Sequence, residues 1–473
     1  MNKSQSIGLT TACVIRSMQR LSLVVLCIGF GLSSFTSALA ISAQQVNDTT
    51  TQTPGAIQIT LDEAIVRAKA NEPNFNAAVA ASHVAALDRT LARAALLPSV
   101  VYHNQYLYTQ PAHGVTDSAN ASAATATSTP RFIGGNAVHE YTSQGVVTET
   151  IGLQQVTAVA RASAATSVAS AELEIARRGL VAAVVGLYYS SLSADRKLTV
   201  AKRAADEASN FTGLTQKREE AREVAHADVV KAQLQQQQRE RDLADMTLQK
   251  EKARLDLAVL LFSDPHTPYT LLRSDSVAPL AQRAEIDAAA TAHNPELASA
   301  LASLRTSSLD VTAARAAYLP DLGLNFSYGI DAAQFAIHAP DGTRNLGYSA
   351  MATLDIPVWD WLSTHNRIRQ KQSLRESARI ALSDTQRKLI AQLDEFYAEA
   401  RVANDQLHSL DVSVETARES LRLTLLRYTA GEANVLEVVD AQNSLTSTEL
   451  AEEDGILRDQ TALANLQILT GTL

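Results

Sequence analysis

The sequence has few residues of several types, and each shortage argues against a class of structure. Aromatic residues make up 5% of the 473-residue chain and there are only 12 prolines, whereas Ala, Leu, Gln, Arg and Glu fill long tracts. This composition is typical of long helices rather than of several compact domains. No stretch after residue 40 holds 18 consecutive apolar residues, so the sequence predicts no transmembrane helix.

Cysteine is confined to the first 40 residues, where Cys13 and Cys27 lie. In this segment basic residues precede the apolar run LSLVVLCIGFGL, and the sequence ALA ends it, which predicts a signal peptide over residues 1–40. A retained N-terminal anchor is the alternative. The residues before Cys27 do not form a lipobox, so we expect no lipid anchor. A cleaved chain would have no cysteine, which excludes disulfides, thiolate metal sites and a cysteine nucleophile, and export without cysteine suggests a bacterial envelope protein.

Positive charge and catalytic motifs are also scarce. The net charge is −9, and removal of residues 1–40, with three basic residues and no acid, would take it to −12. No basic stripe is present, which argues against a nucleic-acid partner. The sequence contains no P-loop, dinucleotide fingerprint, G-x-S-x-G or H-E-x-x-H, and its ten histidines are scattered. We therefore expect no enzyme, no cofactor and no metal site.

The chain contains an internal duplication. The segment around Pro73 aligns without gaps with the segment around Pro295, at an offset of 222. Further along, the offset becomes 209, and HADVVKAQ at residues 226–233 aligns with VLEVVDAQ at residues 435–442, within the stretch NVLEVVDAQ. We expect a signal peptide at 1–40, an N-terminal segment at 41–60, a first repeat at 61–262, a linker at 263–283 and a second repeat at 284–473.

The periodicity changes in the same order within each repeat. A helical tract, about residues 61–97 in the first copy, ends at Pro98, and alternation with a period of two follows. Strands are expected at about 99–109, 141–154, 321–331 and 346–357. Segments of roughly 10 residues have the length of tilted membrane-spanning strands. Strands half-buried in a soluble sheet are the alternative.

A long helical tract follows each pair of strands, at about residues 158–220 and 362–428, and a turn and a return helix follow each tract. At 1.5 Å per residue, each tract would span roughly 90–100 Å. The second tract has apolar residues spaced alternately by four and three, the pattern of a left-handed coiled coil. These residues are Leu389, Leu393, Phe396, Ala400, Ala403, Leu407, Leu410, Val414, Ala417 and Leu421.

Four strands per chain are too few to close a barrel, since the smallest closed barrels have eight. A dimer would supply eight strands around a filled interior, whereas a trimer would supply twelve around a passage. With the helical hairpins continuing below the strands, the assembly would be a conduit across a periplasm. The predicted fold is mainly α with a small transmembrane β part, built as a duplicated helix, β-hairpin and long helical hairpin. The trimer would form a 12-stranded β-barrel on an α-helical barrel.

The sequence resembles the TolC-type outer-membrane efflux proteins. The duplicated layout, LDEAI and NPEL at helix starts, AALLP and AAYLP before the strands, LDIPVWD after the second hairpin and RYTAGEANVLEVVDAQ carry this resemblance over residues 57–471. It implies a homotrimeric channel in the bacterial outer membrane, in contact with outer-membrane lipid. It also implies partners, a periplasmic adaptor and an inner-membrane pump or ABC exporter. The competing hypothesis is a non-conducting coiled-coil protein that tethers or supports the envelope.

By position, the resemblance also assigns roles near the periplasmic tip. Glu437 and Asp440 would line the aperture, although two acids near a helix N-terminus can simply interact with its dipole. Tyr428 and Asp228 would hold the tip closed, although a tyrosine on the seam can be plain packing.

The turns at about 219–227 and 428–436 would contact the adaptor. Because Arg222 stands where the second copy has Gly431, we expect the two turns to differ in shape. Some relatives have an arginine where this chain has Ala433, so the closed state here would lack a charged latch or use Arg222 or Arg427.

Overall fold

The computed structural model describes residues 57–109, 139–272 and 280–473. The expected signal peptide at 1–40, nearly all of the N-terminal segment at 41–60, the loop between the first two strands and part of the linker at 263–283 lie outside the described residues. Within the described residues, no helix combines the length and the apolarity that crossing a membrane requires.

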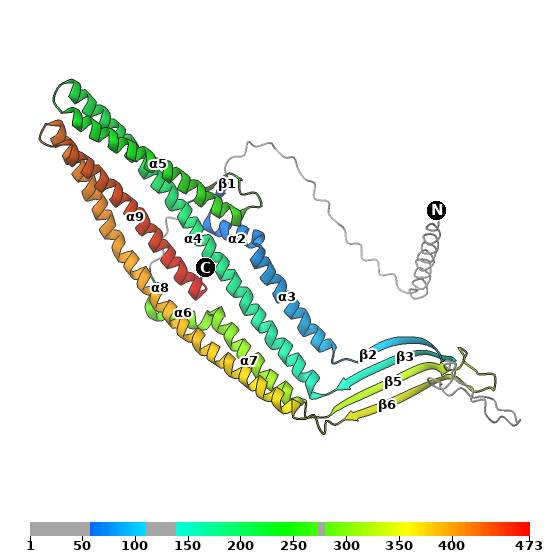
Figure 1. Cartoon of the computed structure of the whole chain (residues 1–473). Helices are drawn as coiled ribbons and strands as arrows, with labels where there is room; N and C mark the ends of the chain where they lie inside the picture. Colours follow the sequence, from blue (N-terminus) through cyan, green and yellow to red (C-terminus); the bar gives the residue numbers. More distant parts are fainter. Residues whose placement is uncertain (1–56, 110–138, 273–279) are drawn as a thin grey trace, which may run out of the picture. The chain divides into compact units, whose positions relative to one another are not determined.

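The two repeats have the same order of elements, which confirms the predicted duplicated fold (Figure 1). The first repeat contains α2 (Leu61–Asn71), α3 (Pro73–Ala94), β2 (Ser99–Tyr108), β3 (His139–Ile151), α4 (Leu153–Glu220) and α5 (His226–Leu261). The second contains α6 (Arg283–His293), α7 (Pro295–Ala316), β5 (Asp321–Ala332), β6 (Leu346–Asp355), α8 (Ser363–Thr429) and α9 (Val435–Thr470). The short strands β1 (Ile57–Ile59) and β4 (Tyr269–Leu271) pair in parallel beside α2.

The tract expected as one helix over residues 61–97 is two helices. α2 ends at Asn71 and α3 begins at Pro73, and the intervening Glu72 has the extended angles φ −76° and ψ 116°. Proline disfavours helical angles at the preceding residue, which explains the break. The second repeat breaks in the same way before Pro295, where the side chain of Asn294 accepts a hydrogen bond of 2.7 Å from the Leu297 N–H.

The four longer strands form one antiparallel sheet in the order β2-β3-β5-β6, so that the pairing of β3 with β5 joins the two repeats. The predicted alternation gives the sheet two different faces. One face is largely apolar, with Phe326 opposite Ala350 and Tyr328 opposite Tyr348. The other is mostly small or polar, with Ser327 opposite Ser349. β2 and β6 each have a strand partner on only one side within the described residues.

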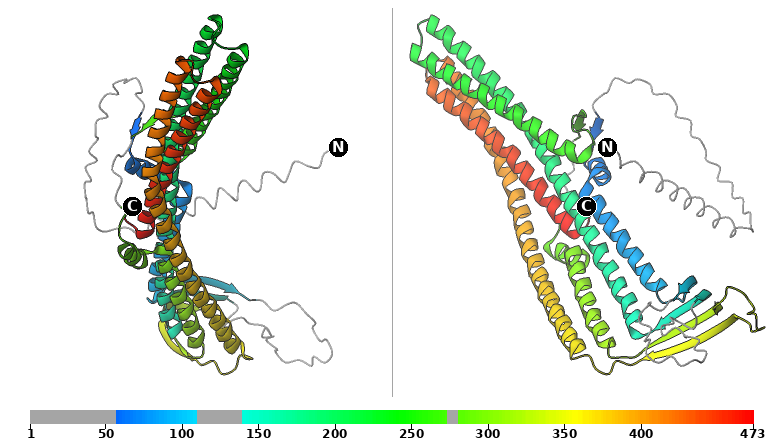
Figure 2. Two further views of the ribbon diagram at one scale, coloured as in Figure 1. Left: turned by 90° about the vertical axis from the view of Figure 1, so that its left-hand side faces the viewer. Right: turned by 45° about the vertical axis from the view of Figure 1, so that its right-hand side comes forward.

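The long helices pack in the order α5, α4, α9, α8, and the views in Figures 1 and 2 agree on this order. α4 has 68 residues and α8 has 67, so each is about 100 Å long. The predicted seam on α8 is confirmed, and it continues seven residues beyond Leu421 to Tyr428. Leu389, Leu393, Ala400, Ala403, Val414, Ala417 and Leu421 are buried, and Phe396, Leu407 and Leu410 are partly buried.

Close packing of α8 on α9 depends on a small residue in α9. A methyl group added at Gly455 would lie 2.4 Å from a methyl carbon of Leu410. Such an overlap is far inside van der Waals contact, so a larger residue there would require the Leu410 side chain to move.

Candidate functional site

The two helix-connecting turns, between α4 and α5 and between α8 and α9, lie side by side at the same end of the long helices (Figures 1 and 2). An apolar cluster fills the space behind them, with Phe211 of α4, Ala232 of α5, Tyr428 of α8 and Val435 and Val438 of α9 among its members. The candidate residues from the sequence all fall in or next to this end, which we call the paired turns (residues 218–228 and 427–437).

The two turns have the same backbone, and the expectation that they differ in shape is wrong. The amide of Arg222 donates to the carbonyl of Glu219 at 2.8 Å, and at the equivalent place Gly431 donates to Tyr428 at 3.1 Å. The next amides, of Glu223 and Glu432, both donate to carbonyls five residues back, at 2.8 Å each. These bonds close each helix in a Schellman-type cap.

A left-handed residue is part of this cap, and φ is +59° at Arg222 and +82° at Gly431. Arginine therefore adopts a conformation that glycine reaches without steric cost. The apolar residues that follow hold both turns in place, because Val229 and its counterpart Val438 are 2% and 0% exposed. The burial of Val229 behind the first turn therefore outweighs the preference of Arg222 for a negative φ.

Arg218 connects the two turns, and the sequence did not single it out. Its guanidinium lies 4.8 Å from the ring centroid of Tyr428 and donates to the Tyr428 carbonyl. The same side chain pairs with Glu223 at 2.9 Å, so it spans from its own turn to the neighbouring one. Its counterpart in the second repeat, Arg427, instead pairs with Glu437 at 3.2 Å and stays within its own hairpin.

Tyr428 lies in the core rather than at the surface, since its side chain is 1% exposed. Its hydroxyl donates to the Thr215 hydroxyl at 3.2 Å, and its ring meets Phe211 edge-on at 5.1 Å. Asp228, the other residue expected in closure, lies half-buried in the first turn of α5. Within one chain the structure therefore does not bring Tyr428 and Asp228 together, and it joins Tyr428 to Arg218 and Thr215.

The N-terminus of α9 is held by a capping box. The Asn434 side chain accepts from the Glu437 N–H at 3.0 Å, and the Glu437 side chain accepts from the Asn434 N–H at 3.3 Å. Glu437 is thus occupied by a cap and by Arg427, as the helix-end alternative for this residue requires. Asp440, one turn further, is exposed and forms no hydrogen bond or ion pair with the described part of the chain. Of the two acids, Asp440 is the freer to face an aperture.

A buried acid lies further along the same helices, and sequence reasoning missed it. Glu449 of α9 is 5% exposed and pairs with Arg203 of α4 and with Arg418 of α8, the latter at 3.4 Å. Burial raises the pKa of the neighbouring Glu207, with Arg203 opposing that shift. Glu449 follows no motif, and the sequence offers no signal for its partners, because they lie on two other helices. The cluster ties α4, α9 and α8 together between the paired turns and the sheet.

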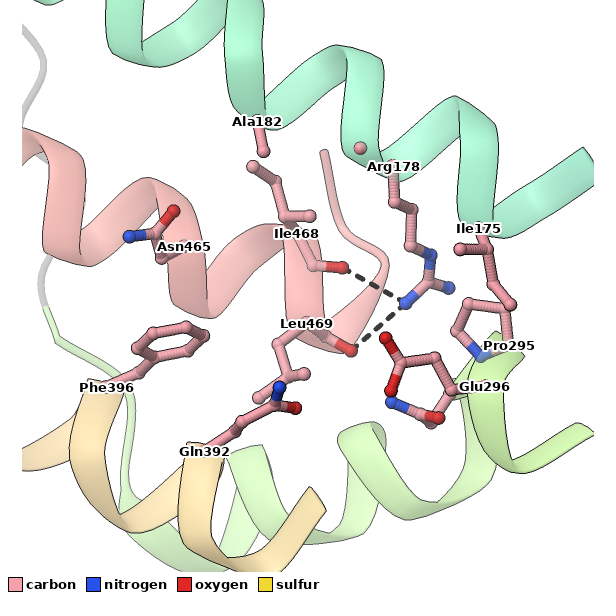
Figure 3. A pocket seen from close by; sticks show the side chains of 12 residues that line it. Ile175, Arg178, Ala182, Pro295, Glu296, Gln392, Phe396, Asn465, Ile468 and Leu469 are labelled. Carbon is pink, nitrogen blue, oxygen red and sulfur yellow. Dashed lines mark hydrogen bonds between the residues drawn. The ribbon is translucent and has the colours of Figure 1, made fainter. Parts of the chain in front are cut away.

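The far end of α9 is held by an arginine of α4 (Figure 3). Arg178 donates to the carbonyls of Ile468 and Leu469 at 3.0 and 3.1 Å, and so adds donors for carbonyls at the helix C-terminus, where the helix itself supplies too few. Hydrogen bonds from Arg177 and then Arg178 lower the pKa of Glu174 to about 2, against the opposing effect of burial. Glu296 and Phe396 line the same pocket from α7 and α8. Among the described residues, no group of acidic, histidine or cysteine side chains could hold a metal ion.

Comparison with known proteins gives a family match for the second repeat. The outer membrane efflux protein family matches residues 288–472. OprJ, an outer membrane protein of Pseudomonas aeruginosa, is 28% identical over 172 residues, which cover 36% of this chain and 36% of OprJ. The match therefore covers about a third of the length of OprJ. The pyoverdine export outer membrane protein OpmQ of Pseudomonas putida is 26% identical over 400 residues, covering 81% of this chain and 80% of OpmQ.

Solved structures share the fold over most of the chain. The outer membrane protein VceC of Vibrio cholerae superposes with a TM-score of 0.73 at 17% identity, covering 87% of this chain and 96% of VceC. The MtrE outer membrane channel of Neisseria gonorrhoeae, solved in its open state, gives a TM-score of 0.69 at 17% identity and covers 93% of this chain and 98% of MtrE. The outer membrane efflux protein family thus matches the second repeat, and over most of its length the chain has the fold of solved outer-membrane channels.

Proposed function

We propose that the chain forms a homotrimeric exit duct through the outer membrane and the periplasm. The observation that carries this proposal is the continuity of a four-stranded sheet, apolar on one face, with two helical hairpins about 100 Å long. Three such sheets joined through β2 and β6, the outer strands of the described sheet, give twelve strands, enough to enclose a passage. Closure also removes the unpaired strand edges that lipid cannot satisfy.

In this duct, transport is passive and a partner supplies the energy. A periplasmic adaptor and an inner-membrane pump or ABC exporter deliver the substrate, and the paired turns are the surface that meets the adaptor. Support comes from the exposure of the turn residues at the ends of the hairpins, including Arg222 and Glu432. OpmQ is named for pyoverdine export. That name describes the cargo of OpmQ, and the cargo of this chain is a separate question.

The channel and the alternative, a non-conducting coiled-coil tether, differ in conductance. Purified protein inserted in a planar bilayer should give single-channel currents, and chemical cross-linking should yield a trimer. Closure at the tip could hide a working channel, so the measurement is repeated with Arg218→Met, which removes the connection between the paired turns. A trimer that inserts and stays silent in both forms would support the tether and contradict the channel.

For the aperture, we propose that Asp440 of each protomer contributes most of the negative charge and Glu437 the rest. Asp440→Asn should reduce the preference of the open channel for cations, measured as the reversal potential across a salt gradient. Glu437→Gln removes the second charge and keeps the capping box, because an amide oxygen can still accept from the Asn434 N–H. Asp405→Asn, at an exposed acid of α8 away from the paired turns, is the control and should leave the selectivity unchanged. Unchanged selectivity in the Asp440→Asn, Glu437→Gln double variant would contradict this assignment.

Closure of the tip, by the same proposal, involves Tyr428 and Asp228 in the assembled trimer, with Arg218 as the connection inside each protomer. Arg218 provides the charged contact that keeps the tip closed, a role for which this chain has no basic residue at Ala433. It binds a main-chain carbonyl and an aromatic face of the neighbouring turn, so loss of this contact loosens the two hairpins from each other at their turns. Arg222 and Arg427, the two candidates from the sequence, form no such connection between the turns in the described part of one chain.

A further inference from the structure

The segment between β6 and α8, residues 356–362 with the sequence IPVWDWL, exposes an unusual amount of apolar surface. Val358 is 88% exposed, Trp359 70%, Trp361 83% and Leu362 61%. The two indole rings contact each other edge to face, with centroids 5.7 Å apart. Large contiguous apolar patches at a protein surface mark sites of interaction. We call these four residues the tryptophan turn.

The backbone conformation that exposes these side chains is sterically unfavourable. Trp361 and Leu362 have φ of +55° and +63°, the left-handed region that bulky residues rarely adopt. Asp360, between the two tryptophans, fixes the turn through its side chain, which accepts from the Thr364 N–H at 2.7 Å. Its carbonyl accepts from the Ser363 N–H at 3.0 Å. Strain that the surrounding structure maintains is typical of functional segments.

The tryptophan turn continues the apolar face of the sheet. Leu354 of β6, opposite Leu322 on that face, is 58% exposed, and Ile356 after it is 60% exposed. The apolar surface thus runs without interruption from the strand into the turn. If the sheet crosses the bilayer, as the proposed function requires, the turn lies where the hydrocarbon layer ends.

Basic residues follow the tryptophan turn in the first turns of α8. Between Asp360 and Glu376 the sequence contains no acid and five residues that can carry positive charge, namely His365, Arg367, Arg369, Lys371 and Arg375. Lys371 pairs with Asp310 at 3.0 Å, whereas Arg367 and Arg369 are exposed. An otherwise acidic chain therefore presents a local positive surface beside its only tryptophans.

We infer that the tryptophan turn and the start of α8 form a binding surface for anionic phospholipid in the leaflet that faces the periplasm. Tryptophan favours the headgroup region, where its ring is half in hydrocarbon and its N–H reaches polar groups. Exposed arginines next to that level bind lipid phosphate, and juxtamembrane basic residues favour anionic lipid. The rigid turn fixes how deep the sheet sits. This inference rests on the proposed function, because it requires the sheet to lie in the membrane.

The sequence allows a direct test, since it contains two tryptophans and both lie in this turn. The full-length protein is reconstituted in phosphatidylethanolamine vesicles with phosphatidylglycerol, and lipids brominated near the headgroup or near the acyl terminus quench the fluorescence. Shallow bromines should quench most strongly, deep bromines weakly, and aqueous acrylamide little. Strong acrylamide quenching without bromolipid quenching would place the turn in water, and an absence of both would place it against a second copy of the chain. Either result overturns the inference.

Variants then separate the contribution of the tryptophans from that of the arginines. Trp359→Phe and Trp361→Phe leave one reporter each and should show the same depth order. Arg367→Gln with Arg369→Gln should lower the preference for brominated phosphatidylglycerol over brominated phosphatidylcholine by about fivefold per arginine. Arg379→Gln, an exposed position further along α8, is the control and should leave that preference unchanged. An unaltered preference in the double variant would overturn the anionic-lipid part of the inference.

Conductance in the same lipids separates this inference from the proposed function. Single-channel currents with tryptophans that bromolipids do not quench would contradict only the lipid surface. Shallow quenching in a protein without currents would contradict only the channel.

Discussion

The paired turns have one backbone and two different sets of side chains, and this contrast shows how duplication has been used in the protein. The cap hydrogen bonds, the left-handed corner and the buried valine after each turn recur at an offset of 209. The polar residues differ: Arg222 replaces glycine, Ala225 occupies the place of the capping Asn434, and Lys231 that of Asp440. Apolar packing has kept the shape of both turns, while the exposed chemistry has diverged.

The different side chains should also make the two turns differ in stability. The second turn has a glycine at its left-handed corner and a capping box at the start of α9. The first has arginine at that corner, and the N-cap residue of α5, Ala225, has no side chain that could cap the helix. The first turn should therefore open more readily than the second. Arg218, which belongs to the first hairpin, then couples this weaker turn to the stronger one.

Loss of the Arg218 connection should have the largest effect. Arg218→Met keeps the apolar stem and removes a charged hydrogen bond to the Tyr428 carbonyl, worth about 1.5–3 kcal/mol, and the pair with the exposed Glu223, worth about 0–1 kcal/mol. We expect faster hydrogen exchange at the paired turns and a higher open probability of the channel. Arg427→Met, at the equivalent position of the second repeat, should leave open probability unchanged because its contacts stay within one hairpin. Equal effects of the two variants would contradict a special role for Arg218.

Removal of the side-chain cap at the start of α9 should have the second-largest effect. Asn434→Ala should destabilise the start of α9 by about 1 kcal/mol, since it deletes the acceptor for the Glu437 N–H. The reciprocal change, Ala225→Asn, should stabilise the start of α5 by a similar amount. Native-state hydrogen exchange of the first-turn amides measures both. If Ala225→Asn gave no added protection, the difference in stability between the turns would not come from capping.

Exchange of the corner residue tests the strain at the first turn. Arg222→Gly should stabilise that turn by about 1 kcal/mol, because glycine adopts a positive φ without steric cost. Gly431→Arg should weaken the second turn by about as much. Limited proteolysis within residues 218–226 and 427–435 reports both changes. A slower cut in Gly431→Arg than in the parent protein would refute the assignment of strain.

The smallest effect is expected at the Tyr428 hydroxyl. Tyr428→Phe keeps the packing against Phe211 and loses one hydrogen bond to Thr215, which is worth about 0.5–1.5 kcal/mol. Thermal unfolding of the trimer should shift slightly downward, and Thr215→Val should reproduce most of the shift. A large rise in open probability in Tyr428→Phe would show that the hydroxyl itself holds the tip closed, as the resemblance implies.

Much of the fold could be predicted from the sequence because its signals are local and repeated. The alternation of the strands, the four-and-three seam from Leu389 to Leu421 and the proline-marked helix ends each follow from residues close together in the chain. The break at Glu72 was missed although Pro73 signalled it, because the helical periodicity runs across both helices.

The candidate site was only partly predictable. The sequence pointed to the end of the molecule that carries the paired turns and to Tyr428, Glu437 and Asp440, whose roles stay predictions, but it gave no indication of Arg218. The partner of Arg218 is a main-chain carbonyl 210 residues away, and any residue could supply that carbonyl. The shape of the first turn was mispredicted for a related reason. The preference of Arg222 against a positive φ is worth about 1 kcal/mol, less than the burial of Val229 behind it.

The sequence by itself determined the duplicated order of elements, the two faces of the sheet and the seam along α8, since each depends on the spacing of residues within one segment. Only the tertiary structure decided that the two turns share a backbone, that Arg218 joins them, and that Glu437 is occupied by a cap and an ion pair while Asp440 has no such partner among the described residues. These outcomes depend on how segments some 200 residues apart are packed, and small differences in packing energy override the local preferences on which sequence reasoning relies.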